Sequence, residues 1–347
     1  MSRDIKGRAA SFNPPNRFER FHLELQEEPD EERSVRTEFF LDSSRSILAE
    51  NESLDVPFKF SINPYRGCEH GCIYCYARPS HEFLGFSAGL DFESKILVKE
   101  DAPVLLEQSF RSKSWKPQIV ALSGNTDPYQ PAERKLELTR RCLEVFLKYR
   151  NPVSVITKNS LVTRDLDILK ELAKLNLVHV HLSITTLDGD LARVMEPRTS
   201  APARRLEALS VLCGNEIPAG VNVSPVIPGL TDEEIPSILR EVAARGAVSA
   251  GYILVRLPGA VEPLFLEWIQ RALPLRAAKI VGRLKEVRRG RMSDSRFGSR
   301  MSGEGKLADS LRDLFLLSCR RYGLNEKEIQ LSVDQFKIPH MDQLNLF

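Results

Sequence analysis

The sequence lacks an apolar run long enough to cross a membrane as a helix. Such a helix needs about 20 consecutive, predominantly apolar residues, and charged residues interrupt the apolar stretches of this chain well before that length. Residues 1–8 also lack the apolar segment that a secretory signal carries behind its basic start. We therefore expect a cytoplasmic protein with no membrane partner.

An excess of charge of one sign is also missing, as are repeats and low-complexity tracts. The 49 Lys and Arg residues nearly balance the 47 Asp and Glu residues, so the formal net charge of +2 points to no class of partner. A repeat architecture is excluded because no segment recurs along the chain. With 42% hydrophobic and 28% charged residues, the 347-residue chain is long enough for one barrel-sized globular domain or two ordinary ones.

Cysteine is scarce but concentrated. Three of the six cysteines, Cys68, Cys72 and Cys75, fall within eight residues in the spacing C-x3-C-x2-C. In a reducing compartment, such a close trio is better explained by metal ligation than by disulfides. Three thiolates are one ligand short of a structural zinc site, but they can hold three irons of a [4Fe-4S] cluster and leave the fourth iron open.

A zinc site is the alternative for the same cysteines. His70, His81 or a distant cysteine could supply its fourth ligand. Zinc sites usually consist of two separated pairs of ligands rather than one tight trio, and this difference favours the cluster.

Short apolar runs alternate with amphipathic segments from residue 58 onward. The sequence predicts strands at 58–62, 118–123, 153–157, 178–184, 220–226 and 251–255, with a short extra strand at 95–99. Helices are expected at 102–111, 132–149, 164–175, 202–214, 232–245, 262–272 and 307–322. Because strands that alternate with helices form a parallel sheet with right-handed crossovers, we expect an α/β fold, a partial (β/α)6 TIM-like barrel.

Composition divides the chain into four parts. We expect an N-terminal extension at 1–55, the barrel at 56–275, a C-terminal basic and helical segment at 276–337, and a tail at 338–347. The cysteine loop, residues 63–78, follows the first barrel strand. It should therefore lie at the carboxyl edge of the sheet, where the chemistry of such folds gathers.

The cysteine loop reads Asn-Pro-Tyr-Arg-Gly-Cys-Glu-His-Gly-Cys-Ile-Tyr-Cys-Tyr-Ala-Arg. With Tyr74 before the third cysteine, it resembles the signature of the radical S-adenosylmethionine (SAM) superfamily, and the spore photoproduct lyase-like, or DNA repair photolyase-like, group within it. The resemblance extends to about Arg320. It implies a [4Fe-4S] cluster whose open iron is chelated by SAM, and one-electron cleavage of SAM to methionine and a 5′-deoxyadenosyl radical. It also implies an electron donor such as flavodoxin or ferredoxin.

The resemblance assigns SAM contacts to the loop and to three strand ends. Tyr74 would lie against the adenine. The residues that stand where the superfamily binds the methionyl amino group are Ser123, Gly124, Asn125 and Thr126. Lys158 and Ser183, at the next two strand ends, match residues that contact the SAM carboxylate and ribose in the spore photoproduct lyase branch. From residue types alone, these segments could also be ordinary turns, with Asp127 capping the next helix.

Two later strand ends carry further candidates. Glu196-Pro-Arg198, after the fourth strand, resembles a family segment. Arg256, after the sixth strand, either points into the cleft or forms a structural salt bridge.

The cysteines outside the loop raise the question of a hydrogen donor, because spore photoproduct lyase uses an additional cysteine to return hydrogen to its product radical. Cys142 and Cys319 share helical faces with apolar residues, so core positions are expected for them. Cys213 is the third candidate. No hydrogen donor is assigned from the sequence.

A basic segment between Lys285 and Lys306 contains seven Lys or Arg and three Asp or Glu residues, interleaved with glycine. It could form a phosphate-binding surface for nucleic acid. The alternative is a solvated glycine-rich loop, since no aromatic ladder beyond Phe297 accompanies the charges.

The chain ends with an apolar motif, which is unusual for a solvated terminus. Its residues are Gln343, Leu344, Leu346 and Phe347. The motif resembles the one by which bacterial polymerases and repair proteins bind the sliding clamp. A tail that folds back on its own domain is the alternative.

Together, these features predict a radical SAM enzyme that acts on a DNA lesion. The substrate rests on group resemblance, the basic segment and the tail. One alternative keeps the radical chemistry and changes the substrate to a protein or an RNA. Another is a zinc-stabilised adaptor that binds DNA and the clamp without enzymatic activity.

Overall fold

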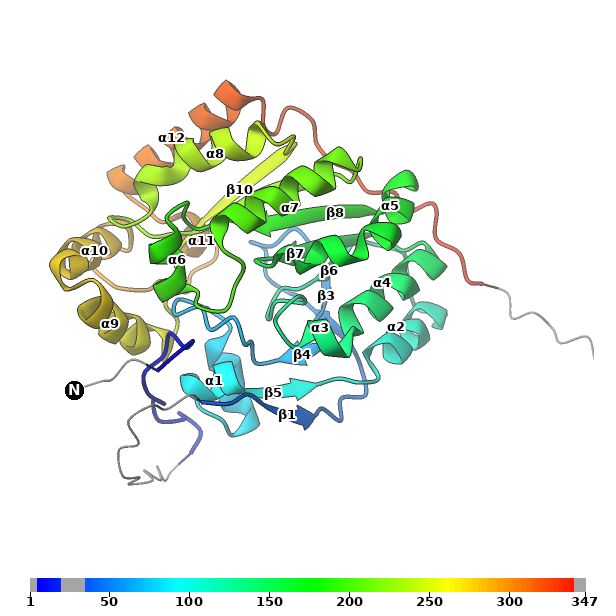
Figure 1. Ribbon diagram of the computed structural model, residues 1–347, viewed down its shortest axis with the longest axis horizontal. Coiled ribbons are helices and arrows are strands. Elements are labelled where there is room, and N and C mark those ends of the chain that lie inside the picture. The colour runs from blue at the N-terminus through cyan, green and yellow to red at the C-terminus, as the bar shows by residue number, and fades with distance from the viewer. Residues whose placement is uncertain (1–4, 20–34, 340–347) are drawn as a thin grey trace, which may run out of the picture.

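The computed structural model describes residues 5–19 and 35–339, which are organised around a seven-stranded sheet (Figure 1). The strand order is β10-β9-β8-β7-β6-β3-β2. The strands are β2 (Leu48–Glu50), β3 (Phe60–Ile62), β6 (Val120–Leu122), β7 (Val153–Thr157), β8 (Val178–Ser183), β9 (Ala219–Val226) and β10 (Ser249–Leu254). Neighbouring strands from β3 to β10 pair in parallel, and β2 is antiparallel to β3.

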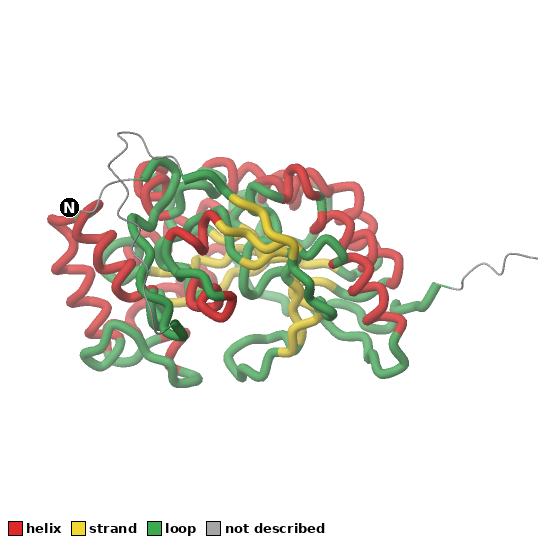
Figure 2. Tube along the Cα trace, turned by 90° about the horizontal axis from the view of Figure 1, so that it is seen from below, coloured by secondary structure: helices red, strands yellow, loops and turns green. Residues whose placement is uncertain are grey.

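Helices connect the parallel strands. They are α2 (Ala102–Arg111), α3 (Glu133–Leu136), α4 (Leu138–Tyr149), α5 (Leu166–Lys174), α6 (Gly189–Met195), α7 (Pro202–Gly214) and α8 (Ile235–Ala243). Two 3-10 turns, Ser160–Asp165 and Asp232–Glu234, precede α5 and α8. The longer helices follow the curve of the sheet on its outer side in Figure 1, and Figure 2 shows the strands as a layer below them. This arrangement confirms the expected partial (β/α)6 fold, with a sheet that remains open between β10 and β2 within the described residues.

The two faces of the sheet differ in chemistry because side chains alternate along a strand. Val153, Val155, Val180 and their neighbours are buried in the main hydrophobic core with the helices. The residues between them are small or polar. They include Ser154, His179, His181, Asn222 and Ser249, which the strand register aligns in rows. The apolar face holds the fold together, and the polar face lines the inside of the open barrel.

The helix expected at 132–149 is two helices, because the chain turns between them. Glu137 takes a left-handed conformation with φ of 50° between α3 and α4. The buried Glu133 carboxylate then accepts hydrogen bonds from the first amides of α4, those of Thr139 (3.0 Å) and Arg140 (3.3 Å). A carboxylate at the N-terminus of a helix stabilises it, so this side chain compensates for the break.

A second, three-stranded sheet lies beside the cysteine loop. Its order is β1 (Glu38–Leu41), β5 (Lys95–Val98) and β4 (Tyr65–Arg66). A 3-10 helix, η1 (Arg78–Leu84), and α1 (Leu90–Ser94) lie between the cysteine loop and β5. Residues 1–55, expected only as an extension, therefore contribute β1 and β2. Both strands are short and largely exposed, which explains why they showed no alternating apolar pattern.

The C-terminal part continues with α9 (Val261–Ala272), α10 (Pro274–Val287), α11 (Ser299–Ser302) and α12 (Lys306–Tyr322). Of these, α10 and the short α11 were not expected from the sequence. After α12 the chain runs along the amino ends of the strands, where the Ser332 amide donates to the Asn176 carbonyl and the Lys337 amide to the Tyr149 carbonyl, both at 2.9 Å. This stretch ends on the right of Figure 1, far from α1. None of the described helices has the length and apolarity that a bilayer span requires.

Candidate functional site

The cysteine loop lies at the carboxyl end of β3, as expected from the sequence. Cys68, Cys72 and Cys75 are free thiols; the first two are buried and the third is partly buried. Backbone hydrogen bonds anchor the loop at two points. The Cys68 amide donates to the Phe92 carbonyl (2.9 Å) and the Ile73 amide to the Met195 carbonyl (3.1 Å). The loop is thus held between α1 and the end of α6.

Arg78, the last residue of the loop, shapes it from within. Its guanidinium is fully buried and donates to the carbonyls of Cys72 (3.0 Å) and Gly71 (3.1 Å). The same group forms an ion pair of 2.5 Å with the fully buried carboxylate of Glu93. Because a planar guanidinium offers five donors in fixed directions, one side chain can fix several carbonyls of a tight loop. The sequence signal did not identify this role.

The electrostatics of the three thiols suits a positively charged ligand. Burial raises the pKa of Cys68, Cys72 and Cys75. The carboxylate of Asp127 raises the pKa of Cys68 further, and that of Glu196 the pKa of Cys72. Thiolates in such a place need a compensating cation, and metal centres supply one.

The histidines do not complete a zinc site with these cysteines. His70 is buried with both ring nitrogens engaged: Nδ1 lies 3.4 Å from Asp127 Oδ2, and Nε2 lies 3.2 Å from Asn159 Nδ2. The His81 ring packs against Phe86, and burial lowers its pKa to about 4. Over residues 5–19 and 35–339, no three His, Cys, Asp or Glu side chains are grouped as ligands of one metal ion. A cluster instead takes each thiolate on a different iron.

The segment after β6 is clamped to the start of the cysteine loop. Asn63 Oδ1 accepts hydrogen bonds from the amides of Asn125 (3.1 Å) and Thr126 (3.0 Å). The Thr126 hydroxyl donates to the Tyr65 carbonyl (2.7 Å). Gly124 has φ of +96°, a conformation that favours glycine. The four candidate residues at 123–126 therefore lie against the loop, with part of their hydrogen bonding used to hold that position.

Asp127 does not cap the next helix, although its Oδ1 accepts a hydrogen bond from the Tyr129 amide (2.9 Å), as turn residues do. Ala132 precedes α3, and the Asp127 carboxylate instead accepts from the Thr157 hydroxyl (2.6 Å) and the Lys158 amide (2.7 Å). It also faces His70 of the cysteine loop. One carboxylate thus ties the ends of β6 and β7 to the loop.

Glu196 is the centre of a buried network at the end of β8. Its carboxylate accepts hydrogen bonds from the hydroxyls of Tyr74 and Thr185 and pairs with Arg205. The Arg205 guanidinium also donates to the Ser183 carbonyl (2.9 Å). The network brings together Tyr74 and Ser183, two of the residues predicted from sequence.

Lys158 joins the same network. Its Nζ lies 3.7 Å from Glu196 Oε1, donates to the Ser224 carbonyl (3.0 Å) and sits 5.7 Å from the centroid of the Tyr74 ring. Burial lowers the pKa of Lys158 to about 8. The predicted residues of β7, β8 and the loop therefore converge on one side of the cysteines.

At the end of β10, Arg256 lies beside Tyr76, the residue after Cys75. Its guanidinium carbon is 5.4 Å from the centroid of the Tyr76 ring, which is 48% exposed. The Tyr76 hydroxyl donates to the Gly124 carbonyl. Arg256 forms no ion pair with another residue that the structure describes, and its pKa is lowered by burial and by the nearby Arg300. The salt-bridge alternative for Arg256 is therefore not observed.

Residues 62–242 match the family model described as the radical SAM superfamily. The chain belongs to the radical SAM superfamily. Its cofactors are a [4Fe-4S] cluster and SAM. An uncharacterized protein of Mycobacterium tuberculosis is 37% identical over 238 residues, which cover 68% of this chain and 69% of that protein.

Solved structures of spore photoproduct lyase share the fold of this radical SAM protein. The lyase complexed with dinucleoside spore photoproduct has a TM-score of 0.59 and 16% sequence identity, covering 87% of this chain and 86% of that chain. A double mutant of the lyase, with bound SAM and the same photoproduct, has a TM-score of 0.57, 16% identity, and coverage of 82% and 80%. At this identity, the likeness shows the fold alone.

The basic segment of this radical SAM protein is only partly available to a ligand. Arg288 is buried and donates to the carbonyl of Val255 (3.0 Å), so it holds the end of β10. Arg289 and Arg296 both pair with Glu304. The segment is therefore a partly neutralised loop and not an open row of cations.

The three remaining cysteines lie on helices that pack in the main core. Cys142 on α4 and Cys319 on α12 are buried there, as expected, and Cys213 on α7 packs at its edge. Burial raises the pKa of all three thiols.

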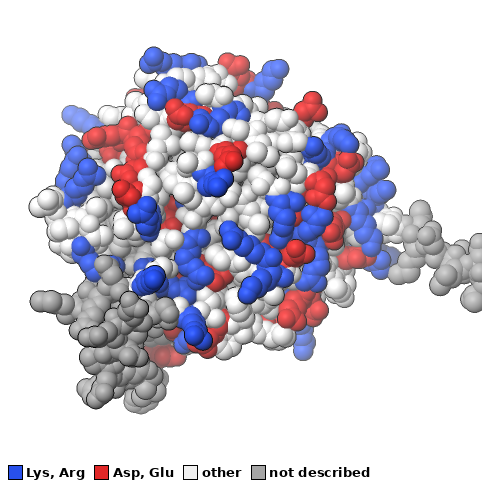
Figure 3. All heavy atoms as spheres, in the orientation of Figure 1, with Lys and Arg blue, Asp and Glu red and all other residues white. Residues whose placement is uncertain are grey.

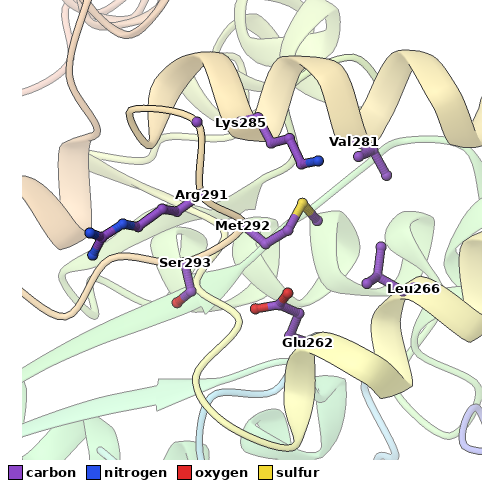
Figure 4. A pocket seen from close by; sticks show the side chains of 8 residues that line it. Glu262, Leu266, Val281, Lys285, Arg291, Met292 and Ser293 are labelled. Carbon is purple, nitrogen blue, oxygen red and sulfur yellow. The ribbon is translucent and has the colours of Figure 1, made fainter.

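A hollow of about 500 Å³ opens between α9, α10 and the loop after α10 (Figure 4). Glu262, Lys285 and Met292 point into it, whereas Arg291 points away. It contains none of the SAM-site residues predicted from sequence.

Proposed function

We propose that this radical SAM enzyme acts on nucleic acid, with a DNA lesion as the substrate. The observation that carries the proposal is the surface at the end of β10, next to the cysteine loop. There the partly buried Arg256 and the exposed ring of Tyr76 face each other. A cation beside an exposed aromatic ring suits a phosphate beside a base, because bases stack on aromatic side chains and phosphates bind guanidinium groups.

A second aromatic and cationic pair extends the same surface. The Arg300 guanidinium carbon lies 4.4 Å from the centroid of the Phe297 ring, which is 58% exposed. Asp55 holds Arg300 in place through an ion pair of 2.6 Å. Spore photoproduct lyase, which shares this fold, has been solved with a dinucleoside photoproduct bound. That observation supports the choice of a nucleic-acid substrate over a protein.

Cys68, Cys72 and Cys75 are the proposed cluster ligands. They are the soft thiolate donors that iron–sulfur clusters require. The backbone of Asp127 lowers the pKa of Cys68, and the backbone of Ala77 and Arg78 lowers that of Cys75, against the larger effect of burial. When bound, the two cofactors supply one-electron cleavage of SAM and hence abstraction of a hydrogen atom from the substrate.

SAM is proposed to bind where the strand ends converge. Lys158 provides the cation for a carboxylate, because it is partly buried and paired only at 3.7 Å with Glu196. Tyr74 and Ser183 border the same region through the Glu196 network. The segment after β6 would supply the contacts to the methionyl amino group, through Ser123, Gly124, Asn125 and Thr126.

The test is formation of 5′-deoxyadenosine by the anaerobically reconstituted protein, reduced with dithionite in the presence of SAM. We expect 5′-deoxyadenosine from the wild type and from Cys213→Ala, and none from Cys72→Ala. UV-irradiated duplex DNA should increase the yield and be altered itself, as seen by mass spectrometry. Formation of 5′-deoxyadenosine that DNA does not change would contradict the DNA substrate, and RNA and protein substrates would be tested next. A colourless protein that contains one zinc would contradict the proposal that the protein is an enzyme.

A sliding clamp is a further proposed partner. The proposal rests on the sequence motif formed by Gln343, Leu344, Leu346 and Phe347. These residues lie outside those that the structure describes. A clamp would place the enzyme on DNA, which agrees with a DNA substrate.

A further inference from the structure

We propose that an acidic electron-carrier protein docks over a cationic hollow behind the cysteine loop. The inference rests on the proposed function, because only a reducible cluster needs such a carrier. The hollow has a volume of about 190 Å³. It is lined by Lys6, Gly7, Arg8, Val35, Arg36, Thr37 and Arg198.

The cysteine loop lies directly behind the hollow and contacts two of its lining residues, Thr37 and Arg198. Glu69, the residue after Cys68, pairs with Arg198 at 3.1 Å and accepts a hydrogen bond from the Thr37 hydroxyl at 2.8 Å. The Arg198 amide also donates to the His70 carbonyl at 3.4 Å. A protein seated on the hollow would therefore be separated from Glu69, the buried residue after the first proposed cluster ligand, by the side chains of Thr37 and Arg198. That position gives a carrier short access to the cluster.

A buried arginine connects the hollow to the interior of the loop. Arg8 is only 7% exposed, and its guanidinium donates to the Thr37 hydroxyl at 3.0 Å and to the Glu93 carbonyl. Glu93 in turn forms the ion pair with Arg78. Two of the four cations of the hollow, Arg8 and Arg198, are thus held in place by contacts with the loop and its support.

The charge of the hollow is unbalanced. Four of its lining residues are cations, and one of them, Arg198, pairs with the Glu69 carboxylate. Lys6 and Arg36 are exposed and form no ion pair with the residues that the structure describes. On the face that Figure 3 shows, Lys and Arg side chains gather below the centre of the molecule, with some Asp and Glu side chains among them. Complementary charge accelerates encounter and orients partners, so the hollow favours an acidic protein surface.

An apolar strip adjoins the cations. β1 follows Arg36 and Thr37 and is the outer strand of the small sheet. Its side chains Phe39 and Leu41 are 53% and 71% exposed. Protein interfaces combine an apolar centre with a polar rim. A charged nucleic-acid backbone, in contrast, does not bind exposed aliphatic side chains such as that of Leu41. The combination therefore favours a protein over DNA at this site.

The docking surface leaves the substrate side free. Glu196 and Arg198 are two residues apart, yet Glu196 contacts Tyr74 and Arg205, whereas Arg198 contacts Glu69 and lines the hollow. The carrier would thus approach the loop from a side other than that of the proposed SAM site. In the transfer, the reduced carrier loses one electron, the cluster gains it, and no bond of the carrier changes.

The test compares two double variants with the same loss of charge. Lys6→Ser with Arg36→Ser removes two cations of the hollow, and Lys113→Ser with Lys116→Ser removes two exposed cations from the loop after α2. Binding of oxidised bacterial flavodoxin and ferredoxin to the anaerobically reconstituted protein is measured by calorimetry at low and high salt. We expect affinity to fall about five- to thirtyfold in the first variant, with a weaker salt dependence, and to stay within about twofold in the second.

Reduction with dithionite separates this inference from the proposed function. With dithionite as the reductant, both double variants should form 5′-deoxyadenosine at the rate of the wild type. With the reduced carrier as the reductant, 5′-deoxyadenosine formation should be slower in the Lys6→Ser, Arg36→Ser variant only. Equal affinities of both variants for the carrier would overturn the proposed docking surface. So would a first variant that binds DNA more weakly but binds the carrier like the wild type. If the wild type formed no 5′-deoxyadenosine with dithionite, the proposed function itself would be overturned.

Discussion

At the scale of single residues, the cysteine loop depends on one buried ion pair. Arg78 and Glu93 are both fully buried, and their partners are backbone groups of the loop and of residues 9 and 10. Removing one member of such a pair leaves an uncompensated buried charge, which costs about 3–5 kcal/mol. The ion pair therefore fixes the shape of the loop but adds little net stability. The cost of removing both charges from water offsets much of the attraction between them.

Lys158→Gln tests the SAM site at the same scale. The substitution removes a partly buried cation next to Tyr74 and Glu196 but keeps a side chain of similar length. A hydrogen bond to a charged group contributes about 1.5–3 kcal/mol, so the Kd for SAM should rise about ten- to a hundredfold. Equilibrium dialysis with the reconstituted protein measures it. The control is Lys170→Gln on the exposed face of α5, and an unchanged Kd for Lys158→Gln would remove this residue from the site.

At the scale of elements, periodicity predicted the strands well. β7 was predicted at its observed bounds, and the other barrel strands within three residues of theirs. The pattern worked because these strands are apolar and buried on the helix side. It failed for β1 and β2, whose exposed residues carry no such pattern. Pairing with β5 and β3, and not their own composition, makes them strands.

Only those residues of the candidate site whose role follows from their spacing within a short segment could be predicted from the sequence. Three cysteines within eight residues reveal a metal site in any fold. The roles of Asn63, Arg78 and Asp127, in contrast, arise from contacts between segments far apart in the chain, such as Asn63 with Thr126. Asn and Asp are also common turn residues. Their types therefore suggested turns, and only the tertiary structure shows what they hold.

The two histidines of β8 should make stability depend on pH. Burial lowers the pKa of His179 to about 4 and that of His181 to about 3, whereas the unfolded chain has the ordinary value of about 6.5. The unfolded state therefore binds more protons below pH 6.5, and stability falls as the pH decreases toward 4. For His181 alone, the loss between pH 7 and pH 5 is about 2 kcal/mol.

Urea unfolding of His181→Leu measures this contribution. The variant should lose about 2 kcal/mol less stability than the wild type between pH 7 and pH 5. At pH 7 it should not be strongly destabilised, because Nδ1 of His181 is buried without a hydrogen-bond partner. Ser154→Ala, on the same polar face, is the control and should keep the pH dependence of the wild type. Parallel pH profiles for the wild type and His181→Leu would show that the histidine titrates normally in the folded state.

At the scale of the whole molecule, both ends of the described chain support the barrel. Near the N-terminus, Arg8 joins the cysteine loop through Glu93. Near the C-terminus, Phe336 packs against Tyr149, with ring centroids 6.4 Å apart, and against Phe110 at 6.2 Å. The chain thus runs from the cofactor side of the sheet at one end to the opposite edge at the other.

Deletion of residues 343–347 tests whether the tail binds a clamp without affecting the enzyme. If the tail binds a clamp and not its own domain, the deletion should leave the thermal midpoint and 5′-deoxyadenosine formation unchanged. Affinity for a bacterial sliding clamp should fall at least tenfold, because the motif residues are removed together. Asn345→Ala changes the one position of the pentapeptide outside the motif and should bind like the wild type. Equal clamp binding by the deletion and the wild type would favour a tail that folds on its own domain, and a lowered thermal midpoint would support that alternative directly.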